Sequence, residues 1–419
     1  MKLGMTLSAA LVASVSWASM ASAQTELSMW YHGAGNEVEA NILDQIVDDF
    51  NASQSDWTVV VESFPQESYN DSVVAAALAG NLPDIIDVDG PVMPNWAWAG
   101  YMQPLQIDES AIEGFLPGPL GYWGGELYSV GLWDAAVAMV TRRSTLDALG
   151  LRTPTLEQPW TGEEFQAALD AAKASGDYEY AFDVGMAWTG EWYPYAFSPF
   201  LQSFGGDIVD RSTYTTAEGA LNGPEALAFG EWWQSMFVDG YAPGTSQDPA
   251  DRDTGFVDGK YAFSWNGNWA ALNALEAHDD TLFLPAPDFG NGPKIGAASW
   301  QFGVSSASEN AEGASAFIEF ALQDKYLANF SNVTGLIPAT STAAAMTDNY
   351  ASGGALEVFF GLSEGQAMLR PVTPGYVVSA KVFEKALADI ANGADVADTL
   401  DAAVDEINAD IESNGGYGH

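Results

Sequence analysis

Short apolar runs alternate with amphipathic stretches along the first part of the chain. Runs of strand length occur at residues 27–32, 58–61 and 85–88. Between the first two, apolar residues recur every four positions with carboxylates between them, which predicts a helix with one buried face: Val38, Ile42, Ile46 and Phe50. A second helical stretch, around residues 73–78, precedes the third run. Strands alternating with helices of this length predict an α/β fold with a mostly parallel sheet.

The same alternation resumes after residue 180. Strands are predicted at residues 182–184 and 261–265, with a long helix over residues 224–237 between them. Residues 126–143 (ELYSVGLWDAAVAMVTRR) are predicted to form one continuous strand that crosses from a first domain to a second. A further apolar strand at residues 299–304 marks the place where the chain crosses back. Two domains joined in this way, without a flexible linker, indicate a hinge.

Residues 1–23 have the features of a removable secretory leader. Lys2 precedes an apolar run that contains four serines, and residues 21–23 (ASA) form a small-residue cleavage site. The mature chain is therefore expected to begin at Gln24, after cleavage behind Ala23. The chain contains no cysteine, so it has neither a disulfide framework nor a lipid-modified cysteine. These features predict a soluble periplasmic protein.

The chain is strongly acidic, with 57 Asp and Glu against 13 Lys and Arg and a formal net charge of −44. Neither lysine nor arginine occurs between Lys2 and Arg142. Nucleic acids and anionic membrane surfaces need clustered basic residues, so neither is expected as a partner. The charge either attracts a cationic solute or forms a solvated surface suited to high salt. Because the acidic residues are spread along the whole chain, the second interpretation is favoured.

The segment from Leu82 to Leu105 (LPDIIDVDGPVMPNWAWAGYMQPL) carries the first candidate for chemistry. Its strand ends in Asp89 on a Gly-Pro turn, and Trp96 and Trp98 follow. Ligands of open α/β sheets bind outside the carboxyl ends of the strands, where Asp89 is expected. A carboxylate beside flat aromatic surfaces suits a sugar, whose hydroxyls donate and whose C–H face stacks. The same pattern also fits a buried strand that ends in a structural turn aspartate.

Several segments, in matching order over most of the chain, resemble the extracellular solute-binding proteins of sugar ABC transporters. They are residues 82–105, 155–165, 196–208 (AFSPFLQSFGGDI), 256–269 and 368–376 (MLRPVTPGY). The resemblance implies a periplasmic-binding-protein fold: two α/β lobes joined by a hinge, with the ligand in the cleft between them. The lobes are expected to comprise residues 24–134 with 298–342, and residues 135–297 with 343–419.

The resemblance also implies a function. Proteins of this family capture a sugar or similar solute and present it to the membrane subunits of an ABC permease. For this chain a glucoside-like disaccharide or a glycosyl-polyol is expected as ligand. The protein is expected to be a monomer without a cofactor and without enzymatic activity.

Within the family, four positions commonly contact carbohydrate, and the resemblance carries them onto Asp89, Asp134, Trp300 and Arg370. Each has an alternative role. Asp134 lies in an apolar strand, where its charge needs donors from either a sugar or the backbone. Arg370 could donate to sugar oxygens or form an ion pair that holds the lobes together. Trp300 could stack on a sugar ring or pack in the core.

Further candidates come from the loops that should border the cleft. The loop at residues 189–192 (TGEW) offers backbone N–H groups, a carboxylate and an aromatic ring, with Gly190 and Trp192 as the expected contacts. Asn266 and Trp269 follow the strand at residues 261–265. His32 and Gln66 follow the first and second strands.

Two other functions remain open from the residues alone. In a glycoside hydrolase, Asp89 and Asp134 would act as an acid/base pair, but no glycosidase motif is apparent. With the same two-lobed fold, a cationic solute such as a polyamine would be drawn to the acidic surface and held by tryptophans and carboxylates. No metal site is expected, because the three histidines are far apart in sequence and cysteine is absent.

Overall fold

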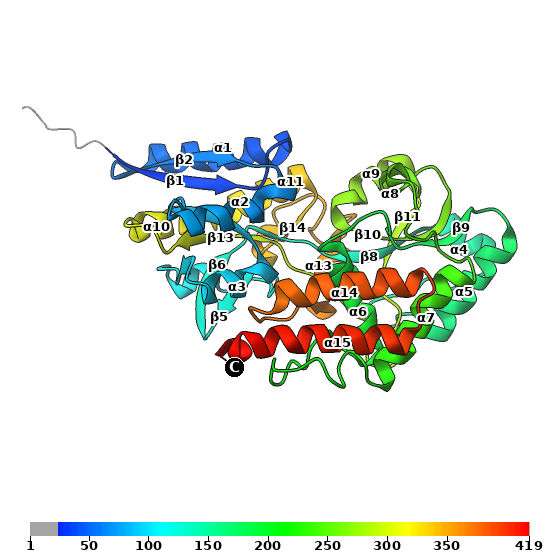
Figure 1. The fold of residues 1–419 in the computed structure, drawn as a ribbon. Helices are drawn as coiled ribbons and strands as arrows, with labels where there is room; N and C mark the ends of the chain where they lie inside the picture. The colour runs from blue at the N-terminus through cyan, green and yellow to red at the C-terminus, as the bar shows by residue number, and fades with distance from the viewer. Residues whose placement is uncertain (1–23, 419) are drawn as a thin grey trace, which may run out of the picture.

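The computed structural model describes residues 24–418, apart from the side chains of residues 252 and 253. The predicted leader, residues 1–23, lies outside the described residues. The chain forms two α/β lobes, each built on its own sheet, with long C-terminal helices along one side (Figure 1). The predicted fold class is therefore confirmed. Among the described residues, no helix combines the length and the apolar composition needed to cross a bilayer.

The first lobe contains the larger sheet, whose strand order is β2-β1-β3-β13-β6-β5 with β4 attached to β13. The strands are β1 (Thr25–Tyr31), β2 (Trp57–Ser63), β3 (Ile85–Asp89), β4 (Met102–Gln103), β5 (Leu120–Trp123), β6 (Glu126–Val130) and β13 (Trp300–Ser305). Its helices are α1 (Glu37–Ser53), α2 (Gln66–Ala79), α3 (Met93–Trp98), α10 (Ala311–Ala321) and α11 (Asp324–Thr334). Strand β1 is parallel to β2 and β3, whereas β13 is antiparallel to β3, β4 and β6, and β5 is antiparallel to β6. The prediction of a mostly parallel sheet was therefore wrong, because β13 returns from the second lobe and runs against its neighbours.

Helix α1 follows the predicted four-residue pattern. The side chain of Asn36 caps it by accepting a hydrogen bond from the N–H of Glu39 at 3.3 Å. Ile42, Ile46 and Phe50 are buried in the core of the first lobe, but Val38, predicted on the same face, is 50% exposed because it lies in the first turn of the helix. Burial of this face fixes α1 against the sheet, so the turn after β1 is held at the carboxyl edge of the strands.

The second lobe contains a smaller sheet with the order β11-β8-β10-β9. The strands are β8 (Val137–Arg142), β9 (Tyr180–Asp183), β10 (Tyr261–Gly267) and β11 (Thr281–Leu284). Many of the other α-helices pack around this sheet. These other helices are α4 (Arg143–Leu149), α5 (Gly162–Ser175), α6 (Trp192–Phe204), α7 (Pro224–Val238), α8 (Pro249–Thr254), α9 (Ala271–Ala277), α12 (Ser341–Ala344), α13 (Glu357–Gly365), α14 (Tyr376–Ala391) and α15 (Val396–Ser413).

The crossing between the lobes differs from the prediction. Instead of one continuous strand over residues 126–143, the chain forms β6, β7 (Trp133–Asp134) and β8. The three pieces pair with different partners: β6 with the first sheet, β7 with β14 (Ile337–Pro338), and β8 with the second sheet. Because each piece must follow the direction of its own partner, the strand breaks between them. The prediction of a continuous strand was wrong.

The return crossing passes from β12 (Ile295–Gly296), which pairs with β15 (Ala367–Met368), into β13. Ala298 lies between β12 and β13 with a φ of +143°, in the region that favours glycine. The backbone is thus strained in the segment that joins the lobes. The residue numbers at which one lobe gives way to the other stay a prediction.

Candidate functional site

Asp89 and Trp300 lie side by side at the ends of two neighbouring central strands of the first sheet. Asp89 is the last residue of β3, Trp300 is the first of β13, and the two are register partners in the antiparallel pairing. Both side chains are partly buried. The carboxylate of Asp89 accepts a hydrogen bond from the N–H of Gly90. Burial raises the pKa of Asp89, and the positive charge of Arg370 opposes that rise.

Arg370 faces Asp89 and Trp300 from the segment that follows β15. Its side chain is 5% exposed, and its Nη1 forms an ion pair with the carboxylate of Glu191, just before α6. The hydroxyl of Tyr376 donates a hydrogen bond to the same oxygen of Glu191. The guanidinium lies 4.9 Å from the centre of the Tyr195 ring, on its face. These contacts hold the arginine in one position.

Two donors in this group have no protein acceptor. Nε of Arg370 and the hydroxyl of Tyr195 are buried, and neither has a hydrogen-bond partner among the described residues. Buried donors without an acceptor are costly, so such groups are normally satisfied by water or a ligand. Together with the carboxylate of Asp89, they provide two donors and one acceptor near the junction of the lobes.

Asp134 is fully buried at the crossing rather than open to the cleft. Its exposure is 0%, and it lies in β7 opposite Ile337 of β14. The carboxylate accepts hydrogen bonds from the hydroxyl of Ser363 in α13 and from the N–H groups of Ala135 and Ala298. Burial raises the pKa of Asp134 to about 6, because these hydrogen bonds offset only part of the desolvation cost. Asp134 therefore ties the outgoing crossing, the return crossing and α13 together.

An aromatic cluster borders the site in the second lobe. The rings of Trp188 and Trp269 stack with centroids 5.7 Å apart, and Trp192 meets Trp269 edge-on at 6.2 Å. Trp192 is 6% exposed, and its Nε1 donates to the carbonyl of Val184. Next to this cluster is a cavity of about 190 Å³ whose wall includes Trp188, Trp269 and Asn266.

The other three predicted contacts are His32, Gly190 and Gln66, of which the first two are engaged by protein groups. His32 is 5% exposed and is covered by Trp300. Gly190 has a φ of +68°, and its N–H donates to the carboxylate of Glu384 in α14 at 2.6 Å. Gln66 is exposed at the first position of α2.

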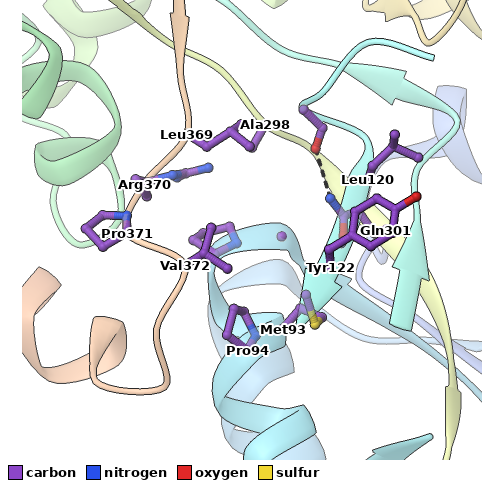
Figure 2. A pocket seen from close by; sticks show the side chains of 14 residues that line it. Met93, Pro94, Leu120, Tyr122, Ala298, Gln301, Leu369, Arg370, Pro371 and Val372 are labelled. Atoms are coloured by element: carbon purple, nitrogen blue, oxygen red, sulfur yellow. Dashed lines mark hydrogen bonds between the residues drawn. The ribbon is translucent and has the colours of Figure 1, made fainter. Parts of the chain in front are cut away.

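A small pocket separates Arg370 from the first lobe. Figure 2 shows the Arg370 side chain extending into it from the strand-like segment that also carries Leu369, Pro371 and Val372. Across the pocket, Nε2 of Gln301 donates to the carbonyl of Gly118 at 2.9 Å. The volume is about 40 Å³, which holds a few water molecules. The two walls are thus nearly in contact.

Sequence reasoning found part of this site. Glu191 supplies the carboxylate that the loop at residues 189–192 predicts, and it binds Arg370. Tyr195 and Gln301 were missed, because neither belongs to a motif and each is one of many similar residues. Their only signal is position: Tyr195 lies in the first turn of α6, and Gln301 follows Trp300. Among the described residues, no group of three His, Cys, Asp or Glu side chains is placed to hold a metal ion.

The family of bacterial extracellular solute-binding proteins matches residues 45–358 of this chain. Among curated proteins, a putative binding protein of Brucella abortus is 24% identical over 358 residues, which cover 81% of this chain and 82% of that protein. The maltodextrin-binding protein MdxE of Bacillus subtilis is 22% identical over 278 residues, 64% of each chain.

Solved structures share the fold. The cyclic α-maltosyl-1,6-maltose binding protein of Arthrobacter globiformis superposes with a TM-score of 0.76 at 22% identity, covering 93% of this chain and 100% of that one. The sugar-binding protein MalE of Xanthomonas citri gives a TM-score of 0.76 at 18% identity, covering 93% and 98%. The two-lobed architecture of sugar-binding proteins is therefore that of this chain.

Proposed function

Because the chain belongs to the bacterial extracellular solute-binding proteins, we propose that it binds a sugar between its lobes and delivers it to an ABC importer. The observation that carries this proposal is the pairing of Asp89 with Trp300 opposite Arg370. An acceptor, a flat aromatic face and a fixed donor within one junction suit the hydroxyls and the C–H face of a sugar ring.

Each group has a distinct role in this proposal. Asp89 accepts hydrogen bonds from neighbouring hydroxyls, and the Nε of Arg370 donates to a ring or hydroxyl oxygen. Trp300 stacks on one sugar ring. Trp269 and Asn266, which line the cavity of about 190 Å³ in the second lobe, receive a second ring. A ligand of at least two rings follows, in keeping with the expected glucoside-like disaccharide or glycosyl-polyol. The names of MdxE and of the Arthrobacter globiformis protein, both of which refer to glucose oligomers, support this size.

Binding requires the lobes to separate. The pocket at Arg370 measures about 40 Å³, whereas ligand sites usually exceed about 300 Å³. We assign the opening motion to the crossings at β7 and Ala298, which join the lobes. Closure over the sugar then removes it from water, and the closed form is what the permease subunits recognise.

A binding role is favoured over glycoside hydrolysis by the environment of Asp134. A hydrolytic pair needs both carboxyl groups beside the glycosidic bond. Asp134 is 0% exposed and is held by Ser363, Ala135 and Ala298. Its proposed role is to hold the hinge, with Asp89 as the acid that contacts the sugar.

We also propose where the protein acts and in what form. The protein acts in the periplasm as a monomer that begins at Gln24 once the leader has been removed behind Ala23. N-terminal sequencing of protein secreted by a Gram-negative host tests the cleavage position.

The function is tested by calorimetric titration of residues 24–419 with mono-, di- and trisaccharides, glycosyl-polyols and spermidine at low and high salt. Saturable binding of one sugar class, unchanged by salt, is the expected result. If none of the sugars binds, and spermidine binds with an affinity that falls steeply as salt is added, the cationic solute is favoured instead.

A further inference from the structure

The ring of His32 lies flat against the indole of Trp300. The two ring centres are 3.9 Å apart and the ring planes differ by 10°. His32 follows β1 directly and is 5% exposed, so it is enclosed by the first lobe on the inner side of Trp300. The ring of Tyr69 meets the same indole edge-on at 5.6 Å. The indole is therefore held by other rings, and His32 covers one of its two faces while the side chain as a whole stays partly exposed.

His32 is also the counter-charge of a buried carboxylate. Its Nδ1 is hydrogen-bonded to Oδ2 of Asp87, whose exposure is 0%. The other oxygen of Asp87 has no hydrogen-bond partner among the described residues. On the opposite edge of the ring, Nε2 of His32 lies 3.8 Å from the carboxylate of Glu39. A buried carboxylate with so few donors needs a positive neighbour.

The acidic surroundings favour the protonated ring. The titratable groups that face His32 are Asp87 and Asp89 from β3, Glu39 from α1, Tyr31 from β1 and Tyr69 from α2. Burial by itself lowers the pKa of His32, but the charges and hydrogen bond of Asp87, with Glu39 and Asp89, raise it above its ordinary value. A positive ring parallel to an indole at this distance is a cation–π contact.

We propose that His32 is a positioning residue whose positive charge clamps the indole of Trp300, so that its far face stays presented to the sugar. The sugar part of this inference rests on the proposed function; the clamp itself does not. When His32 loses its proton, the cation–π contact is lost and Asp87 is left without a counter-charge. The indole then becomes free to move, and sugar affinity falls on the order of threefold to tenfold.

The clamp is tested without any ligand, by tryptophan fluorescence between pH 5 and 10. A protonated imidazole quenches a stacked indole, so wild-type emission should rise in one step above pH 6.5. His32→Phe, which stacks but cannot titrate, should lack the step, and so should Trp300→Phe. Asp87→Asn, which keeps the ring and removes its counter-charge, should move the midpoint to lower pH. A step that persists in His32→Phe, or a midpoint unmoved in Asp87→Asn, would overturn the clamp.

The same proteins are then titrated with maltose at pH 6 and pH 9. The wild-type affinity should fall at pH 9, whereas that of His32→Phe should be the same at both values. Equal wild-type affinities at the two pH values would overturn the link to binding. A fluorescence step without maltose binding at either pH would count against the proposed function for this sugar and leave the clamp in place.

Discussion

Asp89 is the side chain on which the proposed sugar contact depends most. Its carboxylate lies next to Trp300 and faces Arg370, so it is placed to accept hydrogen bonds from sugar hydroxyls. Replacing Asp89 with Ala should weaken sugar binding at least about a hundredfold, since a charge-assisted contact is lost and Arg370 loses a partner charge. The thermal midpoint should stay within a few degrees of the wild-type value, because burial already opposes the charge of Asp89.

Calorimetry and thermal melts of the same preparations check this prediction. Glu62→Gln removes an exposed acid of β2 and serves as the matched control, with unchanged affinity. Sugar binding by Asp89→Ala at the wild-type affinity would show that the contact lies elsewhere.

Asp134 is expected to affect the stability of the protein rather than its affinity for sugar. The unfolded chain loses this proton near pH 4, whereas burial keeps it on the folded protein until about pH 6. Between these values the folded state binds more protons, so stability falls as the pH rises and then levels off. Asp134→Asn lacks this loss. Its free energy of unfolding, relative to wild type, should increase by on the order of 3 kcal/mol from pH 4 to pH 7.

Urea unfolding at the two pH values measures this difference. Glu62→Gln should shift by no more than a few tenths of a kcal/mol across the same range. A constant difference between Asp134→Asn and wild type would mean that burial does not raise the pKa of Asp134 in the folded protein.

At the scale of elements, the crossing segments show which features of the fold could be predicted from the sequence and which could not. The apolar run at residues 126–143 correctly indicated a chain that passes between lobes, and the four-residue pattern of α1 was confirmed except at Val38, which is exposed. The breaks on either side of β7 depend on β14, some 200 positions away, so no local pattern contains them. The same is true of the contact between Asp134 and Ser363. The position of Asp89 at the end of a strand could be predicted, because the alternation of strands and helices is enough to place it there.

The strained backbone at Ala298 gives a prediction for the return crossing. A non-glycine residue at a φ of +143° costs about 1–3 kcal/mol, and glycine removes that cost at the expense of a more flexible unfolded chain. Ala298→Gly should therefore stabilise the protein by roughly 0.5–1 kcal/mol. Differential scanning calorimetry measures the change.

Ala136 provides the matched control. It lies on the outgoing crossing, pairs with Ala297 in an isolated bridge and has an ordinary φ. Ala136→Gly should destabilise by about 0.5–1 kcal/mol. If both glycine variants lower the melting temperature equally, the strain at Ala298 has no energetic consequence.

At the scale of the whole molecule, the net charge of −44 sets the response to salt. With so many like charges on one chain, self-repulsion opposes the compact state, and added salt screens it. The melting temperature should rise between about 0.05 and 1 M NaCl. Affinity for a neutral sugar, the ligand we propose, should stay constant over the same range. A melting temperature that falls with salt would indicate that ion pairs, not repulsion, dominate.

The central claim is that a sugar binds between the lobes against Asp89, Trp300 and Arg370. The most direct test is a crystal structure of residues 24–419 grown with the sugar that binds most tightly in the calorimetric panel. The account predicts a sugar ring on the face of Trp300 away from His32, with hydroxyls within hydrogen-bond distance of Asp89 and Arg370. Electron density for the sugar at any other place, with these three side chains free of it, would contradict the account.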